Sequence, residues 1–379
     1  MVLEPLNVLV LMLVAWLVIY LLSQVLPFEK FGVEVAPLYL TYRTGRLNTF
    51  LKNTAAKRPR LWKVVANVGV ALAVGEILLS VYLLGSNLIH FLYAPEQAQA
   101  VFPFLPGITI GLQWFPYLLI AIGLAITIHE LAHGIVASLE GIAITSAGII
   151  IAPITFGGFV EPDEEDFEKA GLVEKLRFLA AGSLSNLIVG LLITLIATSL
   201  FVPGVGVLVR AVEENGPAYV AGVRPWDVIY GVNETRIEDL ADLAAAMDGV
   251  KPNDLLVVDT TSGIRSVRAG ASSTNASRGV MGVYNLVDYV AVRGGWLSPQ
   301  VTYHLNLTTY WLHLLMINLA VFNMLPLYPL DGEAFVHALL KRRVKKNLKA
   351  VRVIVSSVAF SLLALNMALS FLRYGLTPI

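Results

Sequence analysis

The sequence predicts an α-helical polytopic membrane protein of about six transmembrane helices, with a re-entrant β-like loop and an extracytoplasmic α/β domain. Of its 379 residues, 56% are hydrophobic and only 14% are charged, and the mean hydropathy is +0.72. Soluble domains carry about 25% charged residues, so this composition indicates a lipid environment. The net charge is zero, and we expect no nucleic-acid partner. The absence of cysteine excludes disulfides, thiol catalysis and cysteine-ligated zinc.

Six stretches are apolar over the roughly 20 residues that a helix needs to cross the hydrocarbon core. They cover residues 5–27, 64–92, 114–139, 177–201, 305–326 and 351–373. The first is longer than a signal-peptide core and lacks a clear A-x-A-like cleavage site, so we expect a retained helix.

The apolar segment 143–160 is too short for a seventh span. It is rich in glycine and β-branched residues, and Pro153 interrupts it. Non-helical backbone is tolerated at membrane depth only where protein or a wet cavity covers it. The segment therefore predicts a re-entrant β-like loop that lines a site. The acidic run that follows it, 161–166, is expected to be a solvated loop rather than a metal site.

Lysine and arginine predict the orientation in the membrane. They are concentrated in the segment 28–63 and in "KRRVKKNLK", residues 341–349, whereas the loop 93–113 has none. The positive-inside rule then assigns 28–63, 140–176 and 327–350 to the cytoplasm. The termini, the loop 93–113 and the block 202–304 are expected outside. The absence of cysteine and the retained first helix suit a prokaryotic plasma membrane, and a eukaryotic internal membrane stays open.

The segment "TIHELAHG", residues 127–134, lies inside the third predicted span. The pattern H-E-x-x-H is typical of hydrolytic zinc sites, and residues four apart share a helix face, so His129 and His133 can bind one Zn²⁺. Zinc lowers the pKa of its water to about 7, and Glu130 would accept that proton and return it to the leaving amine. Two histidines hydrogen-bonded within a bundle are the alternative. Ionisable residues inside a span are costly and mark function, which favours the zinc site.

A catalytic zinc usually has three protein ligands, and Asp331 is the best candidate for the third. It lies in "NMLPLYPLDGE", residues 323–333, where an apolar, proline-broken run carries one carboxylate to the membrane edge. The third and fifth spans both run inward, so Asp331 and the two histidines are expected at similar depth. A tight turn ending the helix is the alternative for "PLDG". The remaining histidines are less suitably placed: His90, His304, His313 and His337.

The two motifs together resemble the site-2 protease family of intramembrane zinc metalloproteases. The family pairs HExxH with N-x-x-P-x-x-x-L-D-G, and the second pattern is matched here by Asn323, Pro326, Leu330, Asp331 and Gly332. The resemblance implies that Asp331 is the third zinc ligand and that Glu130 is the general base. "AGSLSN", residues 181–186, is similar to the family's small-residue motif, although Ser183 stands where proline is common. "GGFVEPDEEDF", residues 157–167, resembles the loop after the re-entrant segment.

The expected domains follow from this match. They are 1–113, with N-terminal helices and a basic cytoplasmic loop; the catalytic core halves 114–201 and 305–340; the outer domain 202–304; and 341–379, with a basic loop and the last helix. The two N-terminal helices lie outside the family core. They either brace the bundle or gate lateral access of substrate.

The resemblance implies cleavage of a peptide bond in or near the transmembrane segment of a single-span protein, releasing a membrane-held regulator. A substrate helix must unwind first, and the loop 143–160 could pair with it by β-addition. Bulky residues at Gly157 and Gly158 should then abolish cleavage without removing zinc. Asn186 and Asn323 are candidates for stabilising the oxyanion. Interhelical hydrogen bonding is an equally good interpretation of Asn186.

The block 202–304 turns polar and mixes strand and helix patterns. "VGVLVRAV" alternates like a strand, "IEDLADLAAAMDGV" has helical spacing, and "DLLVVDTTSG" reads as a strand entering a turn. Residues 216–233, "GPAYVAGVRPWDVIYGVN", resemble a PDZ domain, and "PGVGV", residues 203–207, could hold a chain terminus. Such a domain would filter substrates by ectodomain size or hold a new C-terminus. A generic α/β insert without a ligand is the alternative.

Two functions from other classes remain as rivals. A transporter with broken helices around a midplane site predicts repeat symmetry between halves, and the sequence shows none. A membrane scaffold that gathers partners through the PDZ-like domain would have no need of the base Glu130.

Overall fold

The computed structural model describes residues 5–105, 109–152 and 155–375. The chain divides into two compact units, Met1–Leu192 with Trp311–Ile379, and Ile193–Tyr310. Within the described residues, five helices are long and apolar enough to cross a membrane. They are α3 (Pro59–Tyr93), α4 (Phe115–Glu140), α6 (Leu172–Leu200), α9 (Pro299–Asn323) and α11 (Leu348–Tyr374). These five match predicted spans.

The first predicted span is also helical, as α1 (Pro5–Ser23). Its apolar part among the residues searched, Leu13–Ser23, is shorter than the five spanning helices. A sixth crossing therefore stays a prediction. The smaller helices of the same unit are η1 (Phe28–Phe31), α2 (Gly45–Lys57), η2 (Pro95–Gln97), η3 (Leu112–Trp114), α5 (Glu164–Lys169) and α10 (Asp331–Arg343).

The segment predicted as a re-entrant β-like loop is an antiparallel hairpin of β3 (Ile144–Ala152) and β4 (Thr155–Pro162). Pro153 lies outside the described residues. The hairpin belongs to a four-stranded sheet in the order β1-β2-β3-β4, whose other members are β1 (Val33–Val35) and β2 (Leu40–Arg43). The segment 28–63 was expected to be a basic loop, and β1 and β2 within it, with three and four residues, are too short to show an alternation in the sequence.

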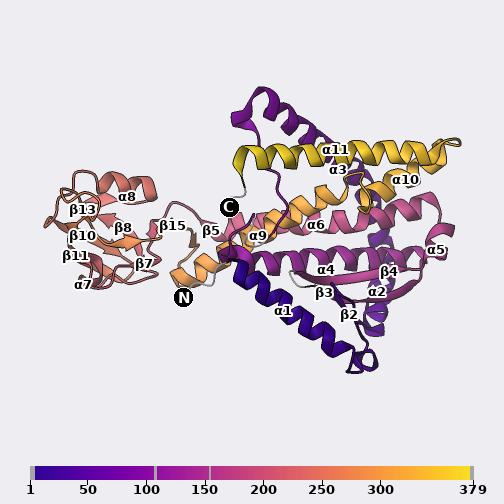
Figure 1. Ribbon diagram of the computed structural model, residues 1–379, viewed down its shortest axis with the longest axis horizontal. Helices are drawn as coiled ribbons and strands as arrows, with labels where there is room; N and C mark the ends of the chain where they lie inside the picture. Colours follow the sequence, from indigo (N-terminus) through magenta and orange to yellow (C-terminus); the bar gives the residue numbers. More distant parts are fainter. Residues whose placement is uncertain (1–4, 106–108, 153–154, 376–379) are drawn as a thin grey trace. The chain divides into compact units, whose positions relative to one another are not determined.

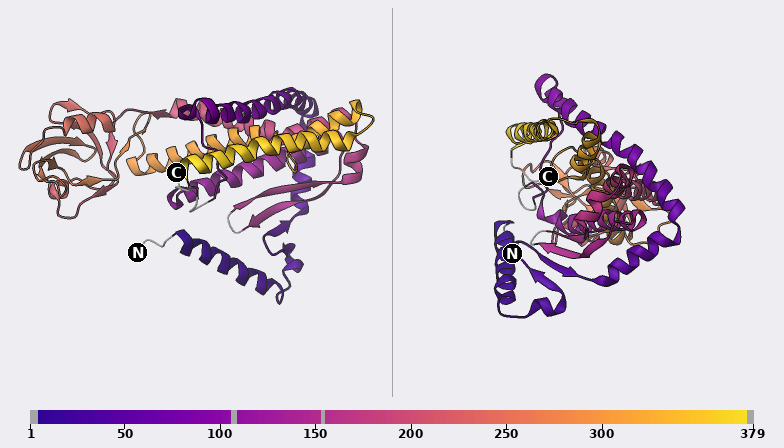
Figure 2. Two further views of the ribbon diagram at one scale, coloured as in Figure 1. Left: turned by 45° about the horizontal axis from the view of Figure 1, so that its top comes forward. Right: turned by 90° about the vertical axis from the view of Figure 1, so that its right-hand side faces the viewer.

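The hairpin lies along α4, and glycines make the close approach possible (Figures 1 and 2). A Cβ at Gly123 of α4 would lie 2.3 Å from the Phe156 ring, and one at Gly157 would lie 2.5 Å from Ile126. The Gly158 N–H also donates to Thr127 Oγ1 at 3.1 Å. The sheet is therefore fixed against the helix that carries the HExxH motif.

Further along the same face of α4, helix α2 closes the packing. Leu51 of α2 is fully buried and fills the space beside Gly134, where a Cβ would lie 2.6 Å from its Cδ1. Helix α3 runs beside α11, and Asn87 donates to Asn366 Oδ1 at 2.8 Å between them (Figure 1). In lipid such polar contacts and small residues take the place of the hydrophobic effect in joining helices.

The second unit, Ile193–Tyr310, contains the block 202–304 and has an α/β fold. Its main sheet has the order β11-β10-β8-β6-β15, with β9 paired to β8. A core that includes Val207, Ile229, Val258 and Val267 packs against it. The elements are β5 (Phe201–Val202), β6 (Val207–Leu208), β7 (Ala211–Val212), α7 (Pro217–Val220), β8 (Val228–Val232), β9 (Thr235–Arg236), α8 (Leu240–Ala246), β10 (Leu255–Thr260), β11 (Gly263–Arg268), β12 (Gly270–Ala271), β13 (Gly279–Val280), β14 (Val283–Tyr284), β15 (Val287–Asp288) and β16 (Ala291–Val292).

Candidate metal centre

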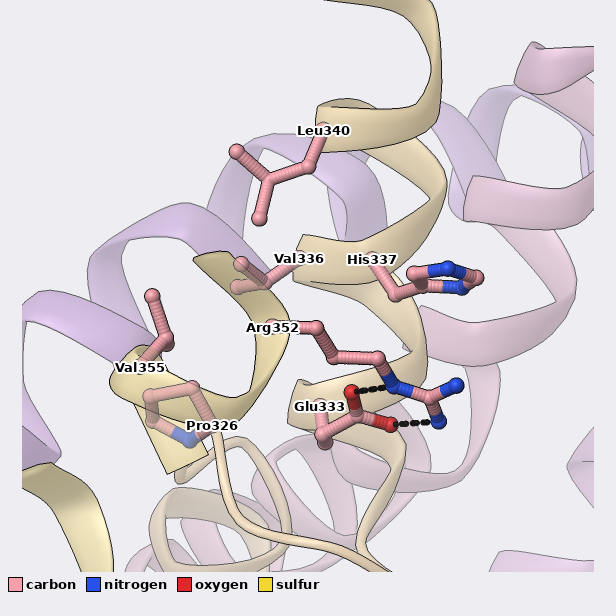
Figure 3. Close-up of a pocket in the computed structure, with 7 residues that line it drawn as sticks. All are labelled: Pro326, Glu333, Val336, His337, Leu340, Arg352 and Val355. Atoms are coloured by element: carbon pink, nitrogen blue, oxygen red, sulfur yellow. Dashed lines mark hydrogen bonds and ion pairs between the residues drawn. The ribbon is translucent and has the colours of Figure 1, made fainter. Parts of the chain in front are cut away.

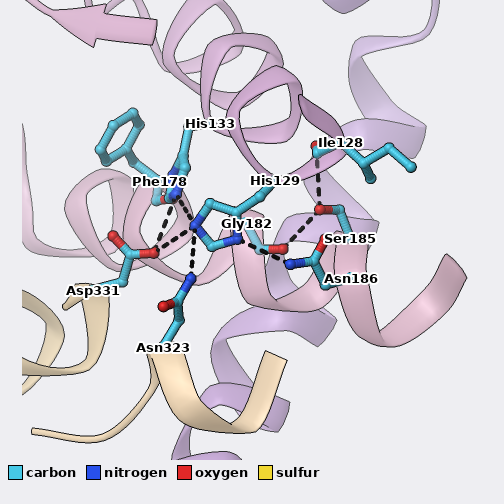
Figure 4. Close-up of polar contacts among 9 residues, drawn as sticks. All are labelled: Ile128, His129, His133, Phe178, Gly182, Ser185, Asn186, Asn323 and Asp331. Atoms are coloured by element: carbon cyan, nitrogen blue, oxygen red, sulfur yellow. Dashed lines mark hydrogen bonds and ion pairs between the residues drawn. The ribbon is translucent and has the colours of Figure 1, made fainter. Parts of the chain in front are cut away.

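Three side chains from two helices meet in the membrane unit. His129 and His133 lie one turn apart on α4 and are 6% and 5% exposed, and Asp331 is the first residue of α10. Asp331 Oδ2 lies 3.0 Å from His129 Nε2 and 3.2 Å from His133 Nε2, and the two nitrogens are 3.1 Å apart (Figure 4). The three residues that helical spacing and matching depth indicate as ligands thus lie together in the structure.

This cluster fits a zinc ion by its donors and by its size. Two imidazole nitrogens and one carboxylate oxygen are a common ligand set for catalytic zinc. Ligand atoms about 2.0–2.1 Å from a tetrahedral ion lie about 3.3–3.4 Å from one another, close to the separations seen here. Within the described residues, His129, His133 and Asp331 are the group of histidines and carboxylates that could hold a metal.

A backbone carbonyl orients His133. Its Nδ1 lies 2.8 Å from Phe178 O of α6, so Nδ1–H donates to that carbonyl and Nε2 carries the lone pair (Figure 4). Metal-ligating histidines are usually fixed through their second nitrogen in this way. Sequence reasoning missed Phe178, because a main-chain acceptor leaves no mark on the residue type.

The two asparagines contact opposite nitrogens of His129. Asn323 Nδ2 lies 3.3 Å from Nε2, and Asn186 Nδ2 lies 3.4 Å from Nδ1 (Figure 4). If Nε2 binds a metal, Nδ1 carries the proton, and Asn186 must present its Oδ1 as the acceptor. That oxygen is buried and has no other partner among the described residues. The position of Asn186 thus suits a group that orients His129, and the position of Asn323, beside the ligand atom, suits contact with substrate.

Glu130 follows His129 directly and is half-buried on α4. Its side chain accepts no hydrogen bond from the described residues. It lies about 100° around the helix from His129, outside the group of ligand atoms. This arrangement leaves its carboxylate available as a proton acceptor, the role that the sequence predicts.

Helix α6 packs so closely against the His129 ring that only a glycine fits at position 182. A Cβ at Gly182 would lie 2.3 Å from Cε1 and 2.4 Å from Nε2 of His129. No other residue type leaves the ring in its place. The small-residue stretch 181–186 was noted in the sequence, and the structure gives its physical reason: the imidazole occupies the space that a side chain would fill.

Gly157 and Gly158 both face α4. A Cβ at Gly157 would lie 2.5 Å from Ile126, and one at Gly158 would lie 3.3 Å from Thr127 Cα. Bulky residues there would push the hairpin off the helix that holds two of the three ligand candidates. The substitutions expected to test substrate pairing would therefore also disturb the metal cluster, and a more selective change is needed.

In the loop 203–207, a backbone N–H that would be needed to bind a chain terminus is already hydrogen-bonded within the domain. Gly206 N–H donates to Glu238 O at 3.1 Å, and Gly206 O accepts from Tyr289 N at 2.8 Å. Both backbone groups of Gly206 are thus engaged within the second unit, which weakens the expectation that this loop holds a carboxylate.

Helices of membrane-spanning length around a His-His-Asp cluster whose histidines are buried and whose aspartate is partly buried, with Glu130 beside it, are typical of an integral membrane metallohydrolase. The sequence profile of peptidase family M50 matches residues 117–365, and the chain belongs to this family. It is a membrane metalloprotease of the site-2 protease type.

The chain is also similar to two further proteins, of which the second is named as a protease homolog. An uncharacterized protein of Methanocaldococcus jannaschii is 26% identical over 351 residues, which cover 89% of this chain and 87% of that protein. A membrane-bound transcription factor site-2 protease homolog of Arabidopsis thaliana is 26% identical over 159 residues, 42% of this chain and 31% of that protein.

Proposed function

We propose that the protein is a zinc endopeptidase that cleaves a peptide bond in or near the transmembrane segment of single-span membrane proteins. The observation that carries this proposal is the cluster of His129, His133 and Asp331, whose ligand atoms lie 3.0–3.2 Å apart. Two of these residues lie inside a helix apolar enough to cross a membrane. Charged and titratable groups are expensive there and are kept for function.

The chain's own residues have distinct parts in the hydrolysis. Zinc bound by the three ligands would supply the Lewis acid that brings the pKa of water to about 7. Glu130 takes the proton from the attacking water and passes it to the leaving amine nitrogen. The Asn323 amide, beside His129 Nε2, donates a hydrogen bond to the carbonyl oxygen as negative charge develops on it. Asn186 holds the His129 ring in the required tautomer.

The β3–β4 hairpin is proposed to receive the unwound substrate. Within the described residues β4 is the terminal strand of its sheet, and because Gly158 N–H on its outer edge already donates to Thr127 of α4, an added strand would pair with the edge beyond Gly158. Gly158 N–H points to Thr127 and thus away from β3. Backbone N–H groups alternate between the two edges of a strand, so Val160 N–H also points away from β3, toward the proposed substrate.

The wider role proposed is regulated intramembrane proteolysis, which releases a membrane-held regulator after a first cut outside. The distribution of lysine and arginine supports a cytoplasmic side for the active site and an outer location for the second unit, in a prokaryotic plasma membrane. That unit is proposed to act as a PDZ-like filter of substrate ectodomains. Its α/β fold and its residues 216–233 support this role.

Zinc content of the detergent-purified protein tests the centre first. We expect about one zinc per chain in the wild type, strongly reduced in Asp331→Ala and kept in Glu130→Gln. Cleavage of a reconstituted single-span substrate should be lost in both variants. A well-folded wild type without zinc would refute the protease mechanism. Loss of zinc in Glu130→Gln would instead mean that Glu130 is a ligand and not the base.

A further inference from the structure

A groove of about 430 Å³ lies between the first turns of α6 and the helix α10. Leu172 and Leu179 of α6 and Ala334 and Ala338 of α10 form its apolar floor. The spacings of seven and four residues put each pair on one helix face. We call this cavity the α6–α10 groove. It belongs to neither the metal cluster nor the β3–β4 hairpin.

The rim of the α6–α10 groove already holds one anionic oxygen between two lysines. Lys341 Nζ lies 3.0 Å from Glu168 Oε2, and Lys175 Nζ lies 3.3 Å from the same oxygen. Lys175 is only 12% exposed, so its ammonium is held in place by its surroundings. These hydrogen bonds, the one from Lys341 first, lower the pKa of Glu168 below its usual value. The rim is thus a region of positive potential built from two different helices.

Positive charge on the rim exceeds the negative charge beside it. Arg342 also lines the α6–α10 groove and has no carboxylate partner in the described part of the chain. Arg352 of α11 lines it too, and its guanidinium pairs with both oxygens of Glu333 (Figure 3). Two lysines and two arginines against two glutamates leave two unbalanced positive charges.

The cations lie where two candidate spans begin. Lys175 is in the first turn of α6, and Arg352 is in the second turn of α11. The end of α4 reaches the same level, because Arg177 of α6 pairs with Glu140 of α4 at 2.9 Å. Span ends mark the boundary between hydrocarbon and water, the level at which phospholipid headgroups lie. Basic pockets between helices at this level suit anionic headgroups.

We propose that the α6–α10 groove binds an anionic phospholipid. Its phosphate would lie among Lys175, Lys341 and Arg342, and its first methylene groups would cover the apolar floor. Charge complementarity and the amphiphilic lining select this ligand. A free phosphate ion would use the cations and leave the floor in water, whereas a zwitterionic lipid would bring a positive charge to a positive rim.

Such a lipid would join the two helices that complete the metal cluster. Helix α6 supplies the Phe178 carbonyl and the Gly182 contact, and α10 begins at Asp331. Bound lipid should therefore raise the thermal stability of the purified protein. The proposal does not rest on the proteolytic function, because lipid retention and thermal stability can be measured without a substrate.

The test compares dioleoyl phosphatidylglycerol with dioleoyl phosphatidylcholine, added to the full-length protein in detergent. We expect native mass spectrometry to show phosphatidylglycerol retained in preference, and the unfolding temperature to rise with phosphatidylglycerol only. Lys341→Gln with Arg342→Gln should weaken the affinity for phosphatidylglycerol about tenfold or more. Arg343→Gln with Lys345→Gln removes the same charge from residues outside the groove and should leave it unchanged.

Charge-conserving exchanges, Lys341→Arg with Arg342→Lys, should retain the lipid and show that the glutamine variant fails through charge. Equal weakening in both glutamine pairs would overturn the proposal in favour of diffuse attraction to the basic segment. Equal retention of the two lipids would overturn it as well. If millimolar inorganic phosphate stabilises the protein as much as phosphatidylglycerol does, the groove is a site for free anions and the lipid assignment is wrong.

Discussion

Replacing Gly182 with alanine is expected to displace the His129 imidazole and remove metal binding. The added Cβ would lie 2.3 Å from Cε1, 2.4 Å from Nε2 and 2.5 Å from Nδ1 of that ring. Non-bonded carbon atoms settle about 3.5–4.0 Å apart, so the ring or the helix must move by roughly 1 Å. The ring is confined on its other sides by Asn186, Asn323 and Asp331, so it cannot move without losing these contacts.

The expected loss follows from the tolerance of metal sites. Metal–ligand distances are held within about 0.2 Å, and a misplacement of about 1 Å in an active site costs about 100-fold in rate. We therefore expect zinc affinity and cleavage each to fall about 100-fold or more in Gly182→Ala. Helix α6 itself should not suffer, because alanine favours a helix over glycine by about 1 kcal/mol.

The assay is zinc content after equilibration with a graded chelator, alongside cleavage of a reconstituted substrate. Gly75→Ala is the matched control, since a Cβ at this glycine of α3 meets nothing within 4 Å. It should keep both zinc and activity. Wild-type zinc affinity in Gly182→Ala would refute the reasoning, because it would mean that α6 gives way without disturbing His129.

Three further changes test other parts of the site. Val160→Pro removes an outward N–H of β4 and should lower cleavage at least about tenfold while zinc stays bound. The control Val160→Ala keeps the N–H and should remain active. Equal effects of the two changes on cleavage would exclude a role of the backbone N–H. Asn186→Ala should weaken zinc binding about 10- to 100-fold, and Asn318→Ala, whose amide bonds only within its own helix, should not; equal zinc affinity would refute an orienting role. Arg177→Met leaves the buried Glu140 carboxylate unpaired and should destabilise the protein by about 3 kcal/mol in thermal unfolding. Adding Glu140→Met should restore most of that stability. Unchanged stability in Arg177→Met would refute a structural role of the pair.

The metal cluster was predictable because it depends on spacing within one helix and on the depth of residues in the membrane, both of which can be read from the sequence. The spacing of His129 and His133 is a property of one helix, and the depth of Asp331 follows from counting residues along two inward spans. The five long apolar helices follow from hydropathy in the same way. None of these inferences required knowledge of which helix packs against which.

What could not be predicted depends on pairing between distant segments. Strand β2 is four residues long, and its Tyr42 pairs with Val33 of β1 on one side and on the other with Ile149, more than a hundred positions away. The orientation of His133 depends on the Phe178 carbonyl, and every residue has a carbonyl. Sequence patterns report side-chain periodicity, so they are silent on main-chain acceptors and on strands too short to show a period.

Glycines allow the close helix packing that holds the metal ligands in fixed positions within the membrane. Helices in a bilayer gain little from burying apolar side chains against one another, so close packing at small residues holds them together instead. Here the approach does more than join helices: Gly182 brings α6 onto the His129 ring, and Gly123 brings α4 onto Phe156 of the hairpin. The contacts that hold this fold together are thus the ones that fix the metal ligands and the proposed substrate strand. Substitutions that loosen the packing at these two glycines should therefore reduce catalysis before they unfold the protein.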